Sequence, residues 1–132
     1  MTTELTLLCW TVVLALVQVG LAGTLRTRET GTGYNLSPRD SPGPPVGTVT
    51  ARLQRAQSNL YETLPLFVAA VLTAHVAGRE GALTLWGSIL YLAGRVIYVP
   101  LYAFGIPGIR TLVWLVAAAG LLLVLLACLL PN

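Results

Sequence analysis

The sequence predicts an all-α integral membrane protein, a four-helix bundle that takes up nearly the whole chain. Of its 132 residues, 55% are hydrophobic and only 10% are charged. The mean hydropathy of +0.77 is far above that of an ordinary soluble domain. Four long, largely apolar stretches are separated by shorter polar or glycine-rich segments. Each span needs about 20 residues, so there is one domain and no room for a separate soluble catalytic domain.

The first predicted span covers residues 5–25, which contain no charged side chain. A signal peptide is the alternative interpretation. It should begin with basic residues, whereas this chain begins with Glu4, and its apolar region should be shorter. We therefore expect a retained span, followed at residues 26–48 by a loop at the membrane surface, because that segment is rich in glycine and proline.

The second predicted span, residues 49–77, starts with several polar turns before its uncharged run. That run alone is slightly short, so the polar turns must enter the membrane, and the bundle must tolerate Pro65. A glycine-rich turn leads to the third span, residues 82–104, and a second turn leads to the fourth, residues 110–130.

All eight basic residues are arginines, and five of them lie between the first and second apolar stretches: Arg26, Arg28, Arg39, Arg52 and Arg55. Short cytoplasmic loops collect basic residues, so this loop is predicted to be cytoplasmic and both termini non-cytoplasmic. No basic face remains free of the bilayer, which argues against nucleic-acid binding. No metal-ligand spacing is present, so no metal site is predicted. The three tryptophans are predicted lipid-facing or interfacial anchors: Trp10, Trp86 and Trp114.

Polar residues form one stripe on each of the two middle helices. Spacings of three and four place the members of each stripe on one helical face: Arg52, Arg55, Asn59 and Glu62 on the second helix, and Tyr91, Arg95, Tyr98 and Tyr102 on the third. Counted from the turn that joins the two helices, Glu62 and Arg95 lie about 24 Å and 21 Å deep. We therefore expect a buried ion pair between them, with either a structural or a functional role.

The two stripes together favour a pocket for a small anionic ligand that enters from the cytoplasm. Arginines would bind its carboxylates and Glu62 an ammonium group. Arg110 opens the fourth helix, where unpaired backbone N–H groups also attract an anion. Glutathione has two carboxylates and one ammonium, although the residues alone do not distinguish it from other amphoteric anions.

Two motifs resemble those of the MAPEG family, the membrane-associated proteins of eicosanoid and glutathione metabolism. The first runs from Arg52 through Asn59 and Glu62 to Pro65, and the second from Gly94 to Thr111 with its Gly-Ile-Pro-Gly-Ile-Arg-Thr segment. The likeness covers nearly the whole chain and is greatest to the short, mostly uncharacterised bacterial branch, which implies location in a bacterial inner membrane.

The resemblance implies a homotrimer with glutathione sites at subunit interfaces near the cytoplasmic surface. It implies roles for two groups of residues. The glutathione-binding residues would be Arg55, Asn59, Glu62, Arg95, Tyr98 and Tyr102, and the catalytic residues beside the thiol would be Arg110 and Thr111. A thiolate stabilised there would attack a lipophilic small-molecule substrate that arrives from the bilayer.

Several positions depart from the prostaglandin-synthase-like members of the family. Ser58 stands in place of an arginine, Tyr98 of a histidine, Thr111 of a serine and Trp114 of a tyrosine. Two hypotheses therefore stand: a glutathione-dependent transferase, peroxidase or isomerase, and a non-catalytic protein of the same fold that binds a lipid or a partner. A transporter ranks third, because the short chain lacks paired broken helices.

Overall fold

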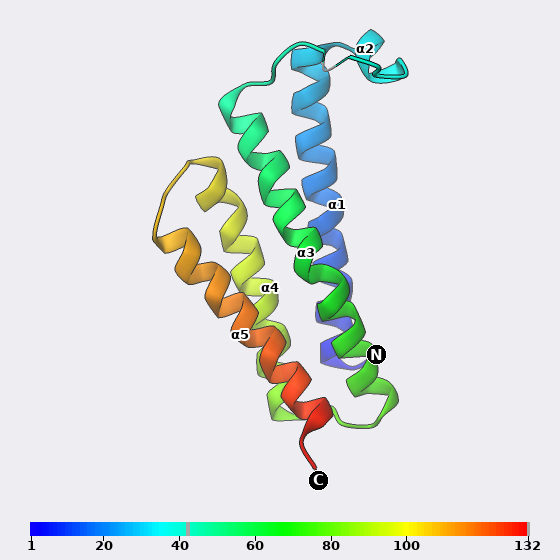
Figure 1. The fold of residues 1–132 in the computed structure, drawn as a ribbon. Coiled ribbons are helices and arrows are strands. Elements are labelled where there is room, and N and C mark those ends of the chain that lie inside the picture. The colour runs from blue at the N-terminus through cyan, green and yellow to red at the C-terminus, as the bar shows by residue number, and fades with distance from the viewer. Residues whose placement is uncertain (42, 132) are drawn as a thin grey trace.

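Five helices and no strand make up the part of the chain that the computed structural model describes, residues 1–41 and 43–131. Four long helices lie side by side (Figure 1). The helices are α1 (Thr3–Thr30), α2 (Thr32–Leu36), α3 (Thr48–Val76), α4 (Ala82–Ala103) and α5 (Ile109–Leu129). We call the end that carries α2 the loop end, and the end at residues 77–81 the turn end. Both chain termini lie at the turn end.

Helix α1 is longer than the sequence analysis expected. Residues 26–30, assigned to the loop, are the last turn of this helix, so the predicted loop starts five residues too early. The Thr27 and Thr30 hydroxyls donate to the carbonyls of Gly23 and Arg26, one turn earlier in the same helix. Gly31 ends it with φ of +89°, a backbone conformation that glycine adopts without strain.

Among the residues that the structure describes, three helices are long and apolar enough to cross a membrane: α1, α4 and α5. The observed ends of α3, α4 and α5 lie within one residue of the predicted span boundaries. Helix α3 has the length, with 29 residues, but it is not among the three apolar helices. The reason is its polar first half, which contains three charged side chains, Arg52, Arg55 and Glu62.

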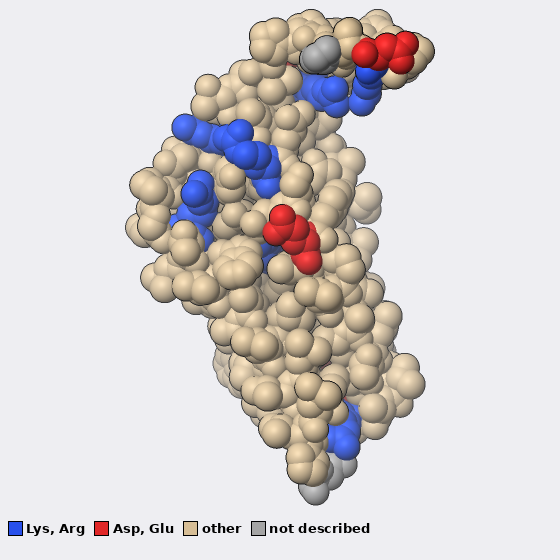
Figure 2. All heavy atoms as spheres, in the orientation of Figure 1, with Lys and Arg blue, Asp and Glu red and all other residues tan. Residues whose placement is uncertain are grey.

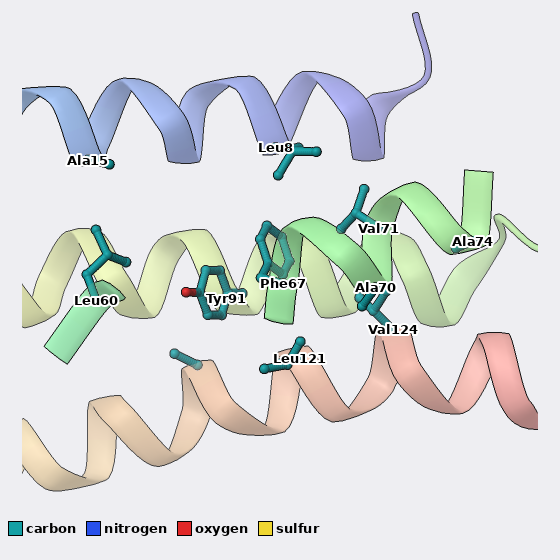
Figure 3. Close-up of a cluster of buried hydrophobic side chains, with 11 residues drawn as sticks. Leu8, Ala15, Leu60, Phe67, Ala70, Val71, Ala74, Tyr91, Leu121 and Val124 are labelled. Carbon is teal, nitrogen blue, oxygen red and sulfur yellow. The ribbon is translucent and has the colours of Figure 1, made fainter. Parts of the chain in front are cut away.

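A single apolar cluster joins the four long helices (Figure 3). Leu8 of α1, Phe67 of α3, Tyr91 of α4 and Val124 of α5 all contribute to it. The rings of Phe67 and Tyr91 stack with centroids 4.1 Å apart and an interplanar angle of 16°. Burial of these side chains fixes α3 against α4. It thereby sets the position of the polar residues that lie one and two turns from Phe67 and Tyr91 in the direction of the loop end.

Helices α4 and α5 approach each other closely at two glycines. A Cβ added to Gly87 would lie 2.5 Å from the Gly120 carbonyl oxygen, and a Cβ added to Gly120 would lie 2.5 Å from the Gly87 carbonyl oxygen. Only a hydrogen at both positions permits this separation. Small residues commonly allow such close packing of helices in membranes, where dispersion contacts rather than hydrophobic burial drive association.

At the turn end, Glu80 ties three segments together. Its carboxylate accepts a hydrogen bond of 2.7 Å from the Thr2 hydroxyl and lies 3.0 Å from His75 Nδ1. Burial acts to raise the pKa of Glu80, but hydrogen bonds with Thr2, His75 and Glu4 and the positive charge of nearby His75 together lower the pKa overall. The Arg79 guanidinium donates to the Leu130 carbonyl and secures the end of α5.

Candidate functional site

A cavity of about 460 Å³ opens near the loop end, between α3, α4 and α5. Every residue that the sequence analysis assigned to the site lines it, with the exception of Arg95. The lining residues are Arg55, Ser58, Asn59, Glu62, Tyr98, Tyr102, Arg110, Thr111 and Trp114. The volume lies within the range of about 300–1,000 Å³ usual for small-molecule sites.

Each wall of the cavity comes from one helix with residues at helical spacing. Arg55, Asn59 and Glu62 lie one turn apart on α3, and Tyr98 and Tyr102 lie one turn apart on α4. The third wall is the first turn of α5, which begins at Ile109 directly after Gly108. The tight 104–108 connection therefore brings α5 in beside α4 with its N-terminus at the cavity.

Tyr102 connects the two cationic walls of the cavity. The Arg55 Nε donates to the Tyr102 hydroxyl at 3.3 Å, and the Arg110 guanidinium carbon lies 4.4 Å from the Tyr102 ring centroid. Tyr98 packs against the same ring with centroids 5.5 Å apart. A guanidinium over an aromatic face is stabilised by the ring quadrupole and keeps its N–H groups at the edge. Two guanidinium groups from different helices are thus held at one aromatic side chain.

Arg95 lies beneath the cavity and is 1% exposed. Its Nη1 donates to the Asn59 side-chain oxygen at 2.9 Å, and its guanidinium carbon lies 4.4 Å from the Tyr98 ring centroid. The predicted ion pair with Glu62 is wrong, because no carboxylate of the described residues lies within salt-bridge distance of Arg95. Arg95 therefore supports two lining residues, Asn59 and Tyr98, instead of lining the cavity itself.

The rotation of α3 explains why Glu62 is not the partner of Arg95. Asn59 and Thr63, four residues apart, both face α4, where they bond to Arg95 and Tyr91, which are also four residues apart. The Thr63 and Tyr91 hydroxyl oxygens are 2.8 Å apart. Glu62 precedes Thr63 by one residue and is turned by about 100° from it, so its carboxylate is exposed at the cavity.

Three residues of the site were not predicted. Ser58 and Trp114 line the cavity, and Thr63 holds Tyr91 below it. Trp114 is half-buried at the cavity, whereas Trp10 and Trp86 are each 59% exposed, as expected of lipid-facing side chains. Helical spacing carried the missing signal, since Trp114 follows Arg110 by four residues and Ser58 follows Arg55 by three.

The charges of the cavity suit an anion that also carries a positive group. Arg55 and Arg110 line it with one carboxylate, that of Glu62, and the buried cation of Arg95 lies beneath. Most of the basic surface of the face in Figure 2 lies over its loop-end half, with one further basic patch near the turn end. Unpaired N–H groups of the first turn of α5 add to the positive potential. No cluster of His, Cys, Asp or Glu within residues 1–41 and 43–131 could hold a metal ion.

One protein-family model matches the chain. The model of the MAPEG family matches residues 7–130, a segment that contains every residue lining the cavity. No curated protein and no solved structure matches the chain significantly. Because the match spans nearly the whole chain and three helices are apolar enough to cross a bilayer, the chain belongs to the MAPEG family and is an integral membrane protein.

Proposed function

We propose that this protein is a glutathione-dependent transferase, peroxidase or isomerase that acts on a lipophilic electrophile at the cytoplasmic membrane face. One observation carries the proposal: a single cavity is lined by Arg55, Arg110 and Glu62, two cations and one anion. That set complements a tripeptide with two carboxylates and one ammonium. Membership of the MAPEG family supports it, because glutathione use is general in that family.

Each wall has a separate task in this proposal. Arg55 binds a glutathione carboxylate, and the exposed carboxylate of Glu62 receives the ammonium group. Asn59 uses its side-chain oxygen to accept from Arg95, so its amide N–H groups remain to donate to the ligand. Tyr98 and Tyr102 flank the bound tripeptide and keep the arginines in place.

Thiol activation is assigned to the start of α5. Glutathione supplies the nucleophilic sulfur when it is bound. Arg110 and the hydroxyl of Thr111 stabilise negative charge on that sulfur, assisted by the free N–H groups of the helix terminus, and so lower the thiol pKa. The electrophile enters from the bilayer beside Trp114. We also propose a homotrimer, the assembly that the family resemblance implies.

The proposal is tested by calorimetric titration of the purified, detergent-solubilised protein with millimolar glutathione, followed by an assay with a chromogenic aryl halide. We expect saturable binding, thiolate absorbance and turnover. Arg110→Gln removes one of the two cations that line the cavity, so it should weaken glutathione binding and also lose roughly 100-fold in turnover, the scale of one lost charge-stabilising donor. Arg28→Gln, an exposed arginine outside this cavity, is the matched control and should behave like the unchanged protein. Absence of both heat and thiolate absorbance rejects the proposal.

The second candidate function is a non-catalytic member of the family that binds a lipid or a partner protein. The cavity contains Ser58 and Tyr98, the positions at which the prostaglandin-synthase-like members carry arginine and histidine, and this observation favours it. Binding of glutathione without thiolate absorbance, together with no turnover of any electrophile, would support this second function over the first.

A further inference from the structure

Two further hollows lie at the loop end, away from the candidate glutathione site. Cavities of about 500 Å³ and 440 Å³ are both lined by Arg26 of α1 and Gln54 of α3, so they adjoin. None of their lining residues belongs to the first cavity. The larger hollow is also lined by Pro44, Pro45 and Val46 of the connection between α2 and α3. The smaller hollow is also lined by Val19 and Ala22 of α1 and by Arg39.

The charge of these hollows is positive only. Arg26 and Arg39 line them, and no Asp or Glu does. Neither arginine makes an ion pair in the described part of the chain. Arg39 donates to the Asn35 carbonyl at 3.0 Å, and the Arg26 guanidinium carbon lies 5.9 Å from the Tyr34 ring centroid. Both contacts hold a guanidinium without neutralising it, so each keeps its positive charge for an outside anion.

The depth of Arg26 is that of the lipid headgroups. Arg26 follows Glu4 by 22 residues on one continuous helix, a rise of about 33 Å. The hydrocarbon core is about 30 Å thick. If the first turn of α1 lies at one membrane surface, Arg26 emerges in the headgroup region of the other.

Along α1 the smaller cavity changes from apolar to cationic. Val19 and Ala22 line its deeper part, and Arg26 lies seven residues, or about 10 Å, nearer the loop end than Val19. This order matches a phospholipid, whose acyl chain lies below its phosphate. A soluble anion would gain nothing from the apolar part.

We propose that Arg26, with Arg39 and Gln54, binds the headgroup of an anionic phospholipid while its acyl chain lies along Val19 and Ala22. Basic pockets between membrane helices recognise anionic headgroups in this way. The site is separate from the proposed glutathione site, so it stands or falls independently of that function.

The test is native mass spectrometry of the delipidated full chain with phosphatidylglycerol or phosphatidylcholine added. The unchanged protein should prefer phosphatidylglycerol, and Arg26→Gln should weaken that binding about fivefold, the effect of one arginine near an anionic surface. Arg39→Gln, which alters an exposed side chain, should weaken it in the same direction. Arg28→Gln is the matched control, because it removes the same charge two residues away, in an adjoining hollow that neither Arg26 nor Arg39 lines.

Four results would overturn the proposal. Equal affinity for the two lipids would show that the hollows do not select lipids by the charge of the headgroup. An equal loss in Arg28→Gln would assign the preference to diffuse surface charge. Displacement of phosphatidylglycerol by millimolar inorganic phosphate would identify a free-phosphate site instead. Loss of glutathione binding in Arg26→Gln, with unchanged lipid binding, would assign Arg26 to the glutathione site.

Discussion

At the scale of single residues, Asn59 links the buried charge of this protein to its cavity. Its side-chain oxygen accepts from Arg95, which is 1% exposed and has two further nitrogens without a hydrogen-bond partner. A guanidinium in a membrane interior is costly unless it is paired or hydrogen-bonded. Asn59 and the Tyr98 ring supply the stabilisation that the sequence suggested would come from Glu62.

Asn59→Leu should therefore lower the free energy of unfolding by about 2–3 kcal/mol, because it removes a hydrogen bond to a buried charge. Glu62→Gln is the comparison. It alters an exposed carboxylate and should change stability by no more than about 0.5 kcal/mol while it weakens glutathione binding. Thermal unfolding in detergent, with calorimetry for binding, measures both. If Glu62→Gln destabilises the protein as much as Asn59→Leu, Glu62 is the counter-ion of Arg95 after all.

At the scale of helices, the close approach of α4 and α5 decides the shape of the cavity. The two glycines at positions 87 and 120 let the helix backbones meet. Gly94 packs in the same way, since a Cβ added there would lie 2.9 Å from that of Ala117. This packing holds the N-terminus of α5 beside the tyrosines of α4. The position of Arg110 relative to Tyr102 thus depends on residues several turns away.

Gly120→Ala should destabilise the protein by about 1–3 kcal/mol, because the added methyl overlaps the Gly87 carbonyl in a packed interface. Gly23→Ala in α1 is the control, since nothing lies within 4 Å of its added Cβ, and it should be neutral or slightly stabilising. Unfolding midpoints of the two variants give the comparison. Equal midpoints for Gly120→Ala and the unchanged protein would mean that the two helices separate without cost.

At the scale of the whole molecule, the path of α3 relative to the bilayer determines the topology. Three helices are apolar enough to span, and α3 runs beside them for a similar length (Figure 1). Its charged residues Arg52, Arg55 and Glu62 turn toward the end of α4 or the cavity. Its apolar residues Phe67, Ala70 and Val71 enter the common core. Shielded in this way, a helix with charged residues can cross a bilayer.

We therefore predict that the loop end and the turn end lie on opposite sides of the membrane, with the loop end cytoplasmic. In a chain whose two cysteines are replaced by alanine, Ser37→Cys should react with an impermeant maleimide from the cytoplasmic side only. Ala77→Cys should react from the other side only. Both positions are exposed. Labelling of both from one side would contradict a membrane-crossing α3.

The sequence alone determined that the protein is helical and lies in a membrane, because the length and apolarity of a span are local properties. Helical periodicity likewise predicted which polar residues share a face, and five of the eight stripe residues line one cavity: Arg55, Asn59, Glu62, Tyr98 and Tyr102. Only the tertiary structure decided which partner each polar group takes. Glu62 and Thr63 differ by a rotation of about 100° around α3. The similar depth of Glu62 and Arg95 therefore does not reveal which α3 side chains face α4. The pairing of Arg95 with Asn59 follows from packing between helices that no single helix encodes.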